Sequence, residues 1–325
     1  MIHQASYHAG ARIGWIEWLP FAATIVVFFA LPEYVPLGAR ILVYILFALS
    51  LDLILGYAGI ITLGHTAFFG LGAYVAGILG AKAGVSDPLL QLAAAGAAAA
   101  VLGVATGAVI LRARGLTLLM LTLAITTILM EIANKATNLT GGADGLSGIK
   151  VDPILGLFRF DMFGKTAYLY CLLALLIGWF IVRRLIYSPF GASLTGIREN
   201  VVRMHAIGAP AYARLVAVYT ISGTIAGCAG ALLMQTNQFV GLNVLSFEFA
   251  GELLVMLVLG GVGRIYGAFV GPLVYMIAQD QLAKQFPEYW YFGIGLLLVA
   301  VVLFARGGIL GLFDTIVTKF RRVRP

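Results

Sequence analysis

Long apolar runs with few charges follow one another along almost the whole chain, separated by short polar connections. They lie at 18–35, 37–55, 60–80, 89–111, 116–133, 167–182, 213–234, 249–262, 265–278 and 290–305. A helix needs about 20 apolar residues to cross the hydrocarbon core of a bilayer. The pattern therefore predicts an all-α, polytopic membrane protein with about ten transmembrane helices.

The composition supports the same fold class. Hydrophobic residues make up 61% of the 325 residues and charged residues only 11%, whereas soluble domains carry about 25% charged residues. Too little polar sequence remains for a separate soluble domain. We expect residues 1–325 to form a single transmembrane domain.

Basic residues gather in two places. Five arginines lie between positions 183 and 214, namely Arg183, Arg184, Arg198, Arg203 and Arg214, and the tail carries Arg306, Lys319, Arg321, Arg322 and Arg324. Lys and Arg favour the cytoplasmic side of a membrane protein. We therefore expect a cytoplasmic loop at 183–211, an external loop at 134–165 and both termini in the cytoplasm. The first apolar run should remain as a helix, because it lacks the features of a cleaved signal.

Two regions are unusually rich in glycine. One covers the third apolar run, and the other joins the eighth and ninth at 260–271. Halves at about 18–133 and 166–306 would hold five crossings each, and an odd number makes them inverted repeats. Glycine-interrupted helices at matching positions of such repeats indicate a transport pathway. Close helix packing through GxxxG spacing, as at Gly103 and Gly107, is the alternative.

Ionisable residues inside or near apolar runs are candidates for functional roles. They are Asp52, His65, Glu131, Glu252 and Asp280. A charge at the bilayer centre costs roughly 2.5–3.5 kcal/mol on insertion scales, so each should face a partner, a cavity or the interface. We expect His65 to bridge a broken helix. A substrate contact or a proton relay is the alternative.

The inner loop at 188–208 reads SPFGASLTGIRENVVRMHAIG. Ser188 and Pro189 are typical of a helix start, and Gly208 is typical of a helix end. The apolar residues Leu194, Ile197, Val201 and Met204 recur at helical spacing, with Arg198, Glu199, Asn200 and Arg203 on the other side. The spacing predicts an amphipathic surface helix. It either lies as a solvated or lipid-bound connector or docks to a cytoplasmic partner.

The residues that carry covalent chemistry are scattered. The four histidines do not cluster, and both cysteines, Cys171 and Cys228, lie in apolar runs. The GKT at 164–166 lacks the first glycine of a phosphate-binding loop. We therefore expect no metal, no cofactor, no nucleic-acid partner and no enzymatic activity in this chain.

Four motifs occur in a fixed order along the sequence. They are GYAGIITLGHTAFFGLGAYVAG at 56–77, TGGADGLSGI at 140–149, the 188–208 segment, and LVLGGVGRIYGAFVGPL at 257–273. Together they resemble the LivM-like inner-membrane permease subunits of branched-chain amino acid ABC importers. The resemblance implies a bacterial inner-membrane protein that assembles with a second related permease, two cytoplasmic ATPases and a periplasmic binding protein.

The resemblance also implies two sets of site residues. The ATPase-coupling set is Ser188, Pro189, Gly191, Gly196, Ile197, Arg198, Glu199, Asn200, Arg203 and Gly208. The translocation set is Thr62, Gly64, His65, Thr66, Phe68, Phe69, Gly260, Gly261 and Gly263. A branched-chain or related hydrophobic amino acid is the expected substrate; urea, aromatic acids or another small solute are alternatives. A stand-alone secondary transporter is the main hypothesis from another class, followed by a membrane enzyme.

Overall fold

The computed structural model describes residues 14–30, 32–154, 156, 158, 164–304 and 307–311. This part of the chain is helical, with two isolated β-bridges, Leu146 to Val240 and Ile154 to Phe158. The predicted all-α fold is therefore confirmed. Arg12, Arg159, Arg306 and the basic tail at 319–324, which were used to predict the topology, lie outside the described residues.

The main helices follow the predicted apolar runs. They are α2 (Leu19–Ala30), α3 (Val35–Asp52), α4 (His65–Ala81), α5 (Pro88–Ile110), α6 (Leu116–Lys135), α8 (Lys165–Ile186), α11 (Ala211–Asn237), α12 (Phe247–Gly260), α13 (Gly267–Gln285) and α14 (Trp290–Phe304). The shorter helices are α7 (Thr137–Thr140), α9 (Pro189–Glu199) and α10 (Val201–Ala206). Within the described ranges, 5 helices are long and apolar enough to cross a membrane, at Pro32–Tyr57, α5, α6, α8 and α11.

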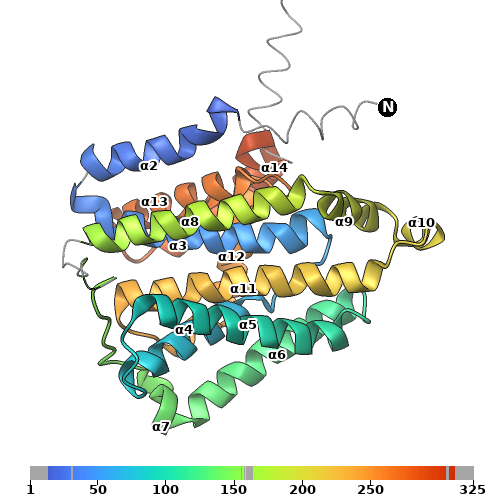
Figure 1. Ribbon diagram of the computed structural model, residues 1–325. Coiled ribbons are helices and arrows are strands. Elements are labelled where there is room, and N and C mark those ends of the chain that lie inside the picture. Colours follow the sequence, from blue (N-terminus) through green and yellow to red (C-terminus); the bar gives the residue numbers. More distant parts are fainter. Residues whose placement is uncertain are drawn as a thin grey trace, which may run out of the picture.

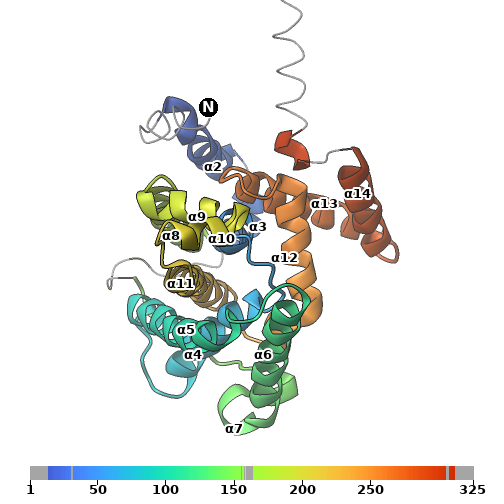
Figure 2. The same ribbon diagram turned by 90° about the vertical axis from the view of Figure 1, so that its right-hand side faces the viewer.

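The long helices form a bundle. Figure 1 shows α3, α5, α8 and α11 side by side along one direction, with α9 and α10 together at one end. Figure 2, turned by 90°, shows them nearly end-on, with α4, α5 and α6 on one side and α12, α13 and α14 on the other. Helix α3 is the central element, because it packs against α8, α11, α12 and α13 and is buried along most of its length.

The outer faces of the bundle are apolar. Large hydrophobic side chains such as Val101 and Val109 on α5, Leu116 on α6 and Leu173 on α8 are exposed. Soluble proteins rarely expose a continuous surface of this kind. These faces fit the hydrocarbon core of a bilayer, as expected for a polytopic membrane protein.

Glycines bring α4, α5 and α11 into backbone contact. A Cβ atom added to Gly72 of α4 would overlap the carbonyl of Gly227 on α11, and one on Gly103 of α5 would lie 2.9 Å from the Cα atom of Thr220 on α11. Small residues allow this close approach of helices. The packing alternative for the GxxxG spacing therefore holds at the interface between α5 and α11.

Candidate translocation and coupling sites

The first glycine-rich region interrupts the helical path between α3 and α4. The chain passes from α3 through a π-helical turn at Leu53–Tyr57, and residues 58–64 are not helical. Gly59 has a φ of 72°, a conformation that favours glycine. The expected break is therefore present, but it lies upstream of His65. Gly70, Gly72 and Gly77 lie inside the uninterrupted α4 and serve packing instead.

The second glycine-rich region separates α12 from α13. Helix α12 ends at Gly260, α13 begins at Gly267, and Gly261 and Gly263 have φ values of 114° and 78°. A Cβ atom on Gly260 would overlap the carbonyl of Gly267, so the two helix ends touch through their backbones. The expected break at Gly260, Gly261 and Gly263 is thus also present.

The two interruptions meet at the C-terminal end of α3. The Asp52 Oδ1 atom accepts a hydrogen bond of 2.7 Å from the backbone N–H of Gly263. A Cβ atom on Gly56 would lie 2.6 Å from that same nitrogen. Sequence reasoning placed Asp52 near the inner end of its helix but missed its partner. We call the residues Asp52, Gly56, Gly59 and Gly263 the glycine junction.

Residues 188–208, which we call the coupling segment, form two helices where the sequence predicted one. Ser188 accepts a 3.4 Å hydrogen bond from the Gly191 N–H and caps α9, with Pro189 in the first position as predicted. The chain is extended at Asn200, whose side chain accepts a 2.9 Å hydrogen bond from the Arg203 N–H and caps α10. Asn strongly favours helix caps, so the predicted single helix is wrong: it is split at Asn200. The end predicted at Gly208 is confirmed, because α10 ends at Ala206 and Gly208 has a left-handed φ of 78°.

The apolar face of the coupling segment packs on the bundle. Leu194 and Ile197 are buried, and Val201 and Met204 are half-buried. Gly191 lets α9 turn sharply away from α8, since a Cβ atom there would overlap the carbonyl of Ile186. Gly196 leaves room for the Met204 sulfur, 2.7 Å from where its Cβ atom would lie. The predicted amphipathic pattern is confirmed.

Arg198 joins the coupling segment to the glycine junction. Its guanidinium donates a hydrogen bond to the carbonyl of Gly56, and its Cγ atom lies 2.8 Å from where a Cβ atom of Gly59 would be. The sequence had placed Arg198 with Glu199, Asn200 and Arg203 on the side facing the cytosol. All four residues are exposed as predicted, but the Arg198 guanidinium also reaches back to the bundle through its contact with Gly56.

The predicted pathway residues around the start of α4 form a buried cluster. The His65 Nε2 atom and the Ser50 Oγ atom are 2.8 Å apart, which links α4 to α3. The His65 ring stacks on Phe47 at a centroid distance of 5.5 Å. The contact with Ser50 holds the start of α4 against α3, directly after the non-helical residues 58–64. This contact fits the structural role expected of His65.

The other members of this set pack around the same place. Phe69 lies against Phe47 and Phe249, and Phe68 lies against Tyr219. The Gly64 N–H donates a 3.0 Å hydrogen bond to Thr62 Oγ1. Thr62, Thr66, Phe68 and Phe69 are all buried. In this single chain they hold α4 in position rather than facing an open cavity.

Replacing His65 with alanine should lower the stability of the folded chain by roughly 2–4 kcal/mol, because it removes a buried ring and its hydrogen bond. Thermal unfolding of the purified protein in detergent would measure this loss. The exposed His205 offers a matched control. An unchanged unfolding temperature together with lost transport would instead favour a substrate contact or a proton relay.

Metal-ligating residues do not gather in the described part of the chain. No group of three or more His, Cys, Asp or Glu residues there is arranged to hold an ion. Cys171 is buried and Cys228 is partly buried, both as free thiols. The conspicuous feature of the site is the contact that ties the surface segment at 188–208 to the two interrupted helices.

Comparison with known proteins gives the family. Residues 37–302 match the family described as the branched-chain amino acid transport system permease component. The high-affinity branched-chain amino acid transport system permease proteins LivM of Escherichia coli (strain K12) and Salmonella typhimurium (strain LT2) are each 27% identical over 298 residues, which covers 85% of this chain and 69% of the relative. No solved structure gives a significant match. Since the family match spans most of its length, this chain belongs to the branched-chain amino acid transport system permease family.

Proposed function

We propose that this chain is the permease subunit of an ATP-binding-cassette importer that carries branched-chain amino acids across the bacterial inner membrane. Family membership and the two LivM relatives support the transport function and the substrate class. The observation that carries the mechanism is the contact of Arg198 with the Gly56 carbonyl, because it joins the surface segment to the interior of the bundle. ATP hydrolysis would take place on a separate chain.

The proposed assembly pairs this subunit with a second related permease, two cytoplasmic ATPases and a periplasmic binding protein. We assign ten crossings in two inverted repeats, at about 18–133 and 166–306, with an external loop at 134–165 and both termini in the cytoplasm. The count of apolar runs and the distribution of basic residues support this arrangement. The two helix interruptions do not occupy matching places in the two halves, since one precedes the third run and the other follows the eighth.

The proposed coupling runs through the glycine junction. The exposed Glu199, Asn200 and Arg203 would contact the ATPase, and α9 would move with it. Arg198 would carry that movement to Gly56, and the Asp52 to Gly263 hydrogen bond would pass it on to α12 and α13. The helix ends at 56–64 and 260–263 would then shift together and open or close the route beside α4, which Thr62, Gly64, His65, Thr66, Phe68 and Phe69 hold in place.

Replacing Glu199 and Arg203 together with alanine should lower the amount of ATPase that copurifies with the permease roughly tenfold, as expected when polar anchors of an interface are removed. Both side chains are exposed, so the permease should still fold and enter the membrane. The exposed Glu131 and Lys135 pair on α6 provides a matched double-alanine control. Undiminished ATPase recovery from the Glu199 and Arg203 variant would exclude this surface as the docking site.

Reconstitution tests the proposed function itself. Liposomes that hold the complete complex, with ATP at the ATPase side and binding protein outside, should accumulate labelled leucine. Accumulation should stop when a non-hydrolysable ATP analogue replaces ATP. Uptake driven by an ion gradient in liposomes that hold this chain alone would support the secondary transporter instead. Uptake of urea or aromatic acids in place of leucine would show that the proposed substrate class is wrong.

A further inference from the structure

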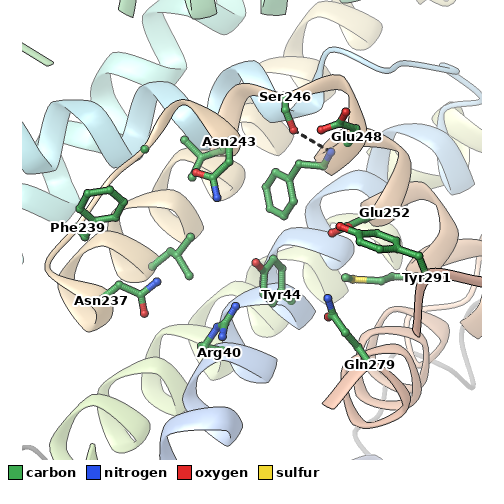
Figure 3. Close-up of a pocket in the computed structure, with 15 residues that line it drawn as sticks. Arg40, Tyr44, Asn237, Phe239, Asn243, Ser246, Glu248, Glu252, Gln279 and Tyr291 are labelled. Atoms are coloured by element: carbon green, nitrogen blue, oxygen red, sulfur yellow. Dashed lines mark hydrogen bonds between the residues drawn. The ribbon is translucent and has the colours of Figure 1, made fainter. Parts of the chain in front are cut away.

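A pocket of about 280 Å³ opens at the end of the bundle opposite the coupling segment. It is bounded by the start of α3, the end of α11, the connection that follows it, the start of α12, and parts of α13 and α14 (Figure 3). Arg40 lies near the first turn of α3, whereas Gly56 and the glycine junction lie at the other end of that helix. This volume lies just below the range of about 300–1,000 Å³ that is typical of ligand sites, so the pocket has room for a small solute only.

Opposite charges line facing walls of the pocket. Figure 3 shows Arg40 and Tyr44 on α3, with Glu248 and Glu252 across from them on α12. Among the described residues, no ion pair joins Arg40 to either glutamate. The Arg40 guanidinium interacts with the Tyr44 hydroxyl and is not neutralised by either glutamate, so the pocket presents both charges to a ligand that carries a negative and a positive group.

Apolar side chains also line the pocket beside the charged and polar ones. Leu233, Val244, Phe249 and Met256 all line the pocket. The Phe249 ring is held in place, because it packs against Tyr44 and Phe47 with centroid distances of 5.7 Å in each case. A rigid aromatic and aliphatic surface of this kind binds a hydrocarbon side chain and excludes water from it.

We propose that this pocket is an outer binding site for a zwitterionic α-amino acid with an aliphatic side chain. Arg40 binds the carboxylate, for which the planar guanidinium is the best-matched side chain. Glu252, with Glu248 at the rim, binds the ammonium group, and Phe249 and Val244 contact the side chain. The substrate class in this inference rests on the proposed function, but the pocket, its charges and its apolar surface do not.

Photolabelling of the reconstituted complex tests this site directly. A diazirine analogue of leucine, which keeps both charges, should label residues of the pocket, with Val244 and Phe249 among the modified positions found by mass spectrometry. Arg40→Gln and Glu252→Gln should each reduce this labelling at least tenfold. The same variants should reduce leucine uptake at saturating binding protein at least tenfold, with the ATPase rate within about twofold of the unaltered complex.

Matched controls separate binding from folding. Glu131→Gln and Lys135→Gln alter an exposed pair on α6, away from the pocket, and should change neither labelling nor uptake. Arg40→Lys should restore part of both. The inference would be overturned if the label were found only at positions outside the pocket. It would also be overturned if neither Arg40→Gln nor Glu252→Gln lowered labelling and uptake. A complex that fails to transport leucine but is still labelled in this pocket would disprove the proposed function while leaving the binding site in place.

Discussion

Alanine in place of Gly230 should prevent the bundle from closing, with a loss of stability of about 3 kcal/mol or more. The added Cβ atom would overlap the backbone carbonyl of Phe69, because α11 and α4 are in direct backbone contact there. A helix backbone cannot rotate away as a side chain can, so the helices must separate. The amount of protein that elutes as a single folded species after extraction in detergent, and its unfolding temperature, measure the effect.

Gly251→Ala is the matched control, since Gly251 also lies within a helix and has no neighbouring atom within 4 Å of the added Cβ position. Alanine there should be neutral or slightly stabilising, because glycine is the poorer helix former. Equal behaviour of the two variants would show that α4 and α11 do not pack as described.

Arg198→Ala should uncouple transport from ATP hydrolysis. It removes the contact with the Gly56 carbonyl but leaves the exposed Glu199 and Arg203 in place for the ATPase. We expect the complex to assemble and to hydrolyse ATP, while leucine uptake falls roughly tenfold or more, within the usual range of coupling free energies. Uptake and phosphate release, measured on the same proteoliposomes, give the ratio of transported leucine to hydrolysed ATP.

Two further variants define the role of Arg198. Arg198→Lys should recover part of the uptake, since an ammonium group can still donate to the carbonyl but lacks the rigid fork of the guanidinium. Asp52→Asn should lower the ratio of transported leucine to hydrolysed ATP as Arg198→Ala does, because it weakens the hydrogen bond that links α3 to Gly263. If Arg198→Ala no longer bound the ATPase, this account would be contradicted. Arg198 would then be part of the surface that contacts the ATPase.

Much of the fold could be predicted from local sequence patterns. Apolar runs mark the helices because backbone polar groups must be satisfied within the membrane. The start of α9 follows from Ser188 and Pro189, and the start of α5 follows from Asp87 and Pro88. The apolar face with Leu194 and Ile197 followed from helical spacing alone. The family could be inferred from four motifs in order, which the match over residues 37–302 confirms.

The contacts that join distant segments could not be predicted in this way. The Asp52 to Gly263 hydrogen bond links residues 211 positions apart, and no periodicity encodes such a pair. Arg198 is an exposed arginine in the sequence pattern and in the structure, and only the fold shows that its guanidinium reaches the Gly56 carbonyl. Likewise, the sequence marked Glu252 as a candidate but gave no sign of Arg40 or Glu248, and only the fold places their opposite charges across one pocket.

The location of the coupling segment is the central claim, and one labelling measurement tests it. Val202 on α10 is 75% exposed, so a cysteine placed there, with Cys171 and Cys228 replaced by alanine, should be accessible to solvent on one side of the membrane. An impermeant maleimide should modify it in inside-out vesicles and leave it unmodified in intact spheroplasts. Modification in intact spheroplasts would place α9 and α10 outside the cell and contradict the coupling mechanism.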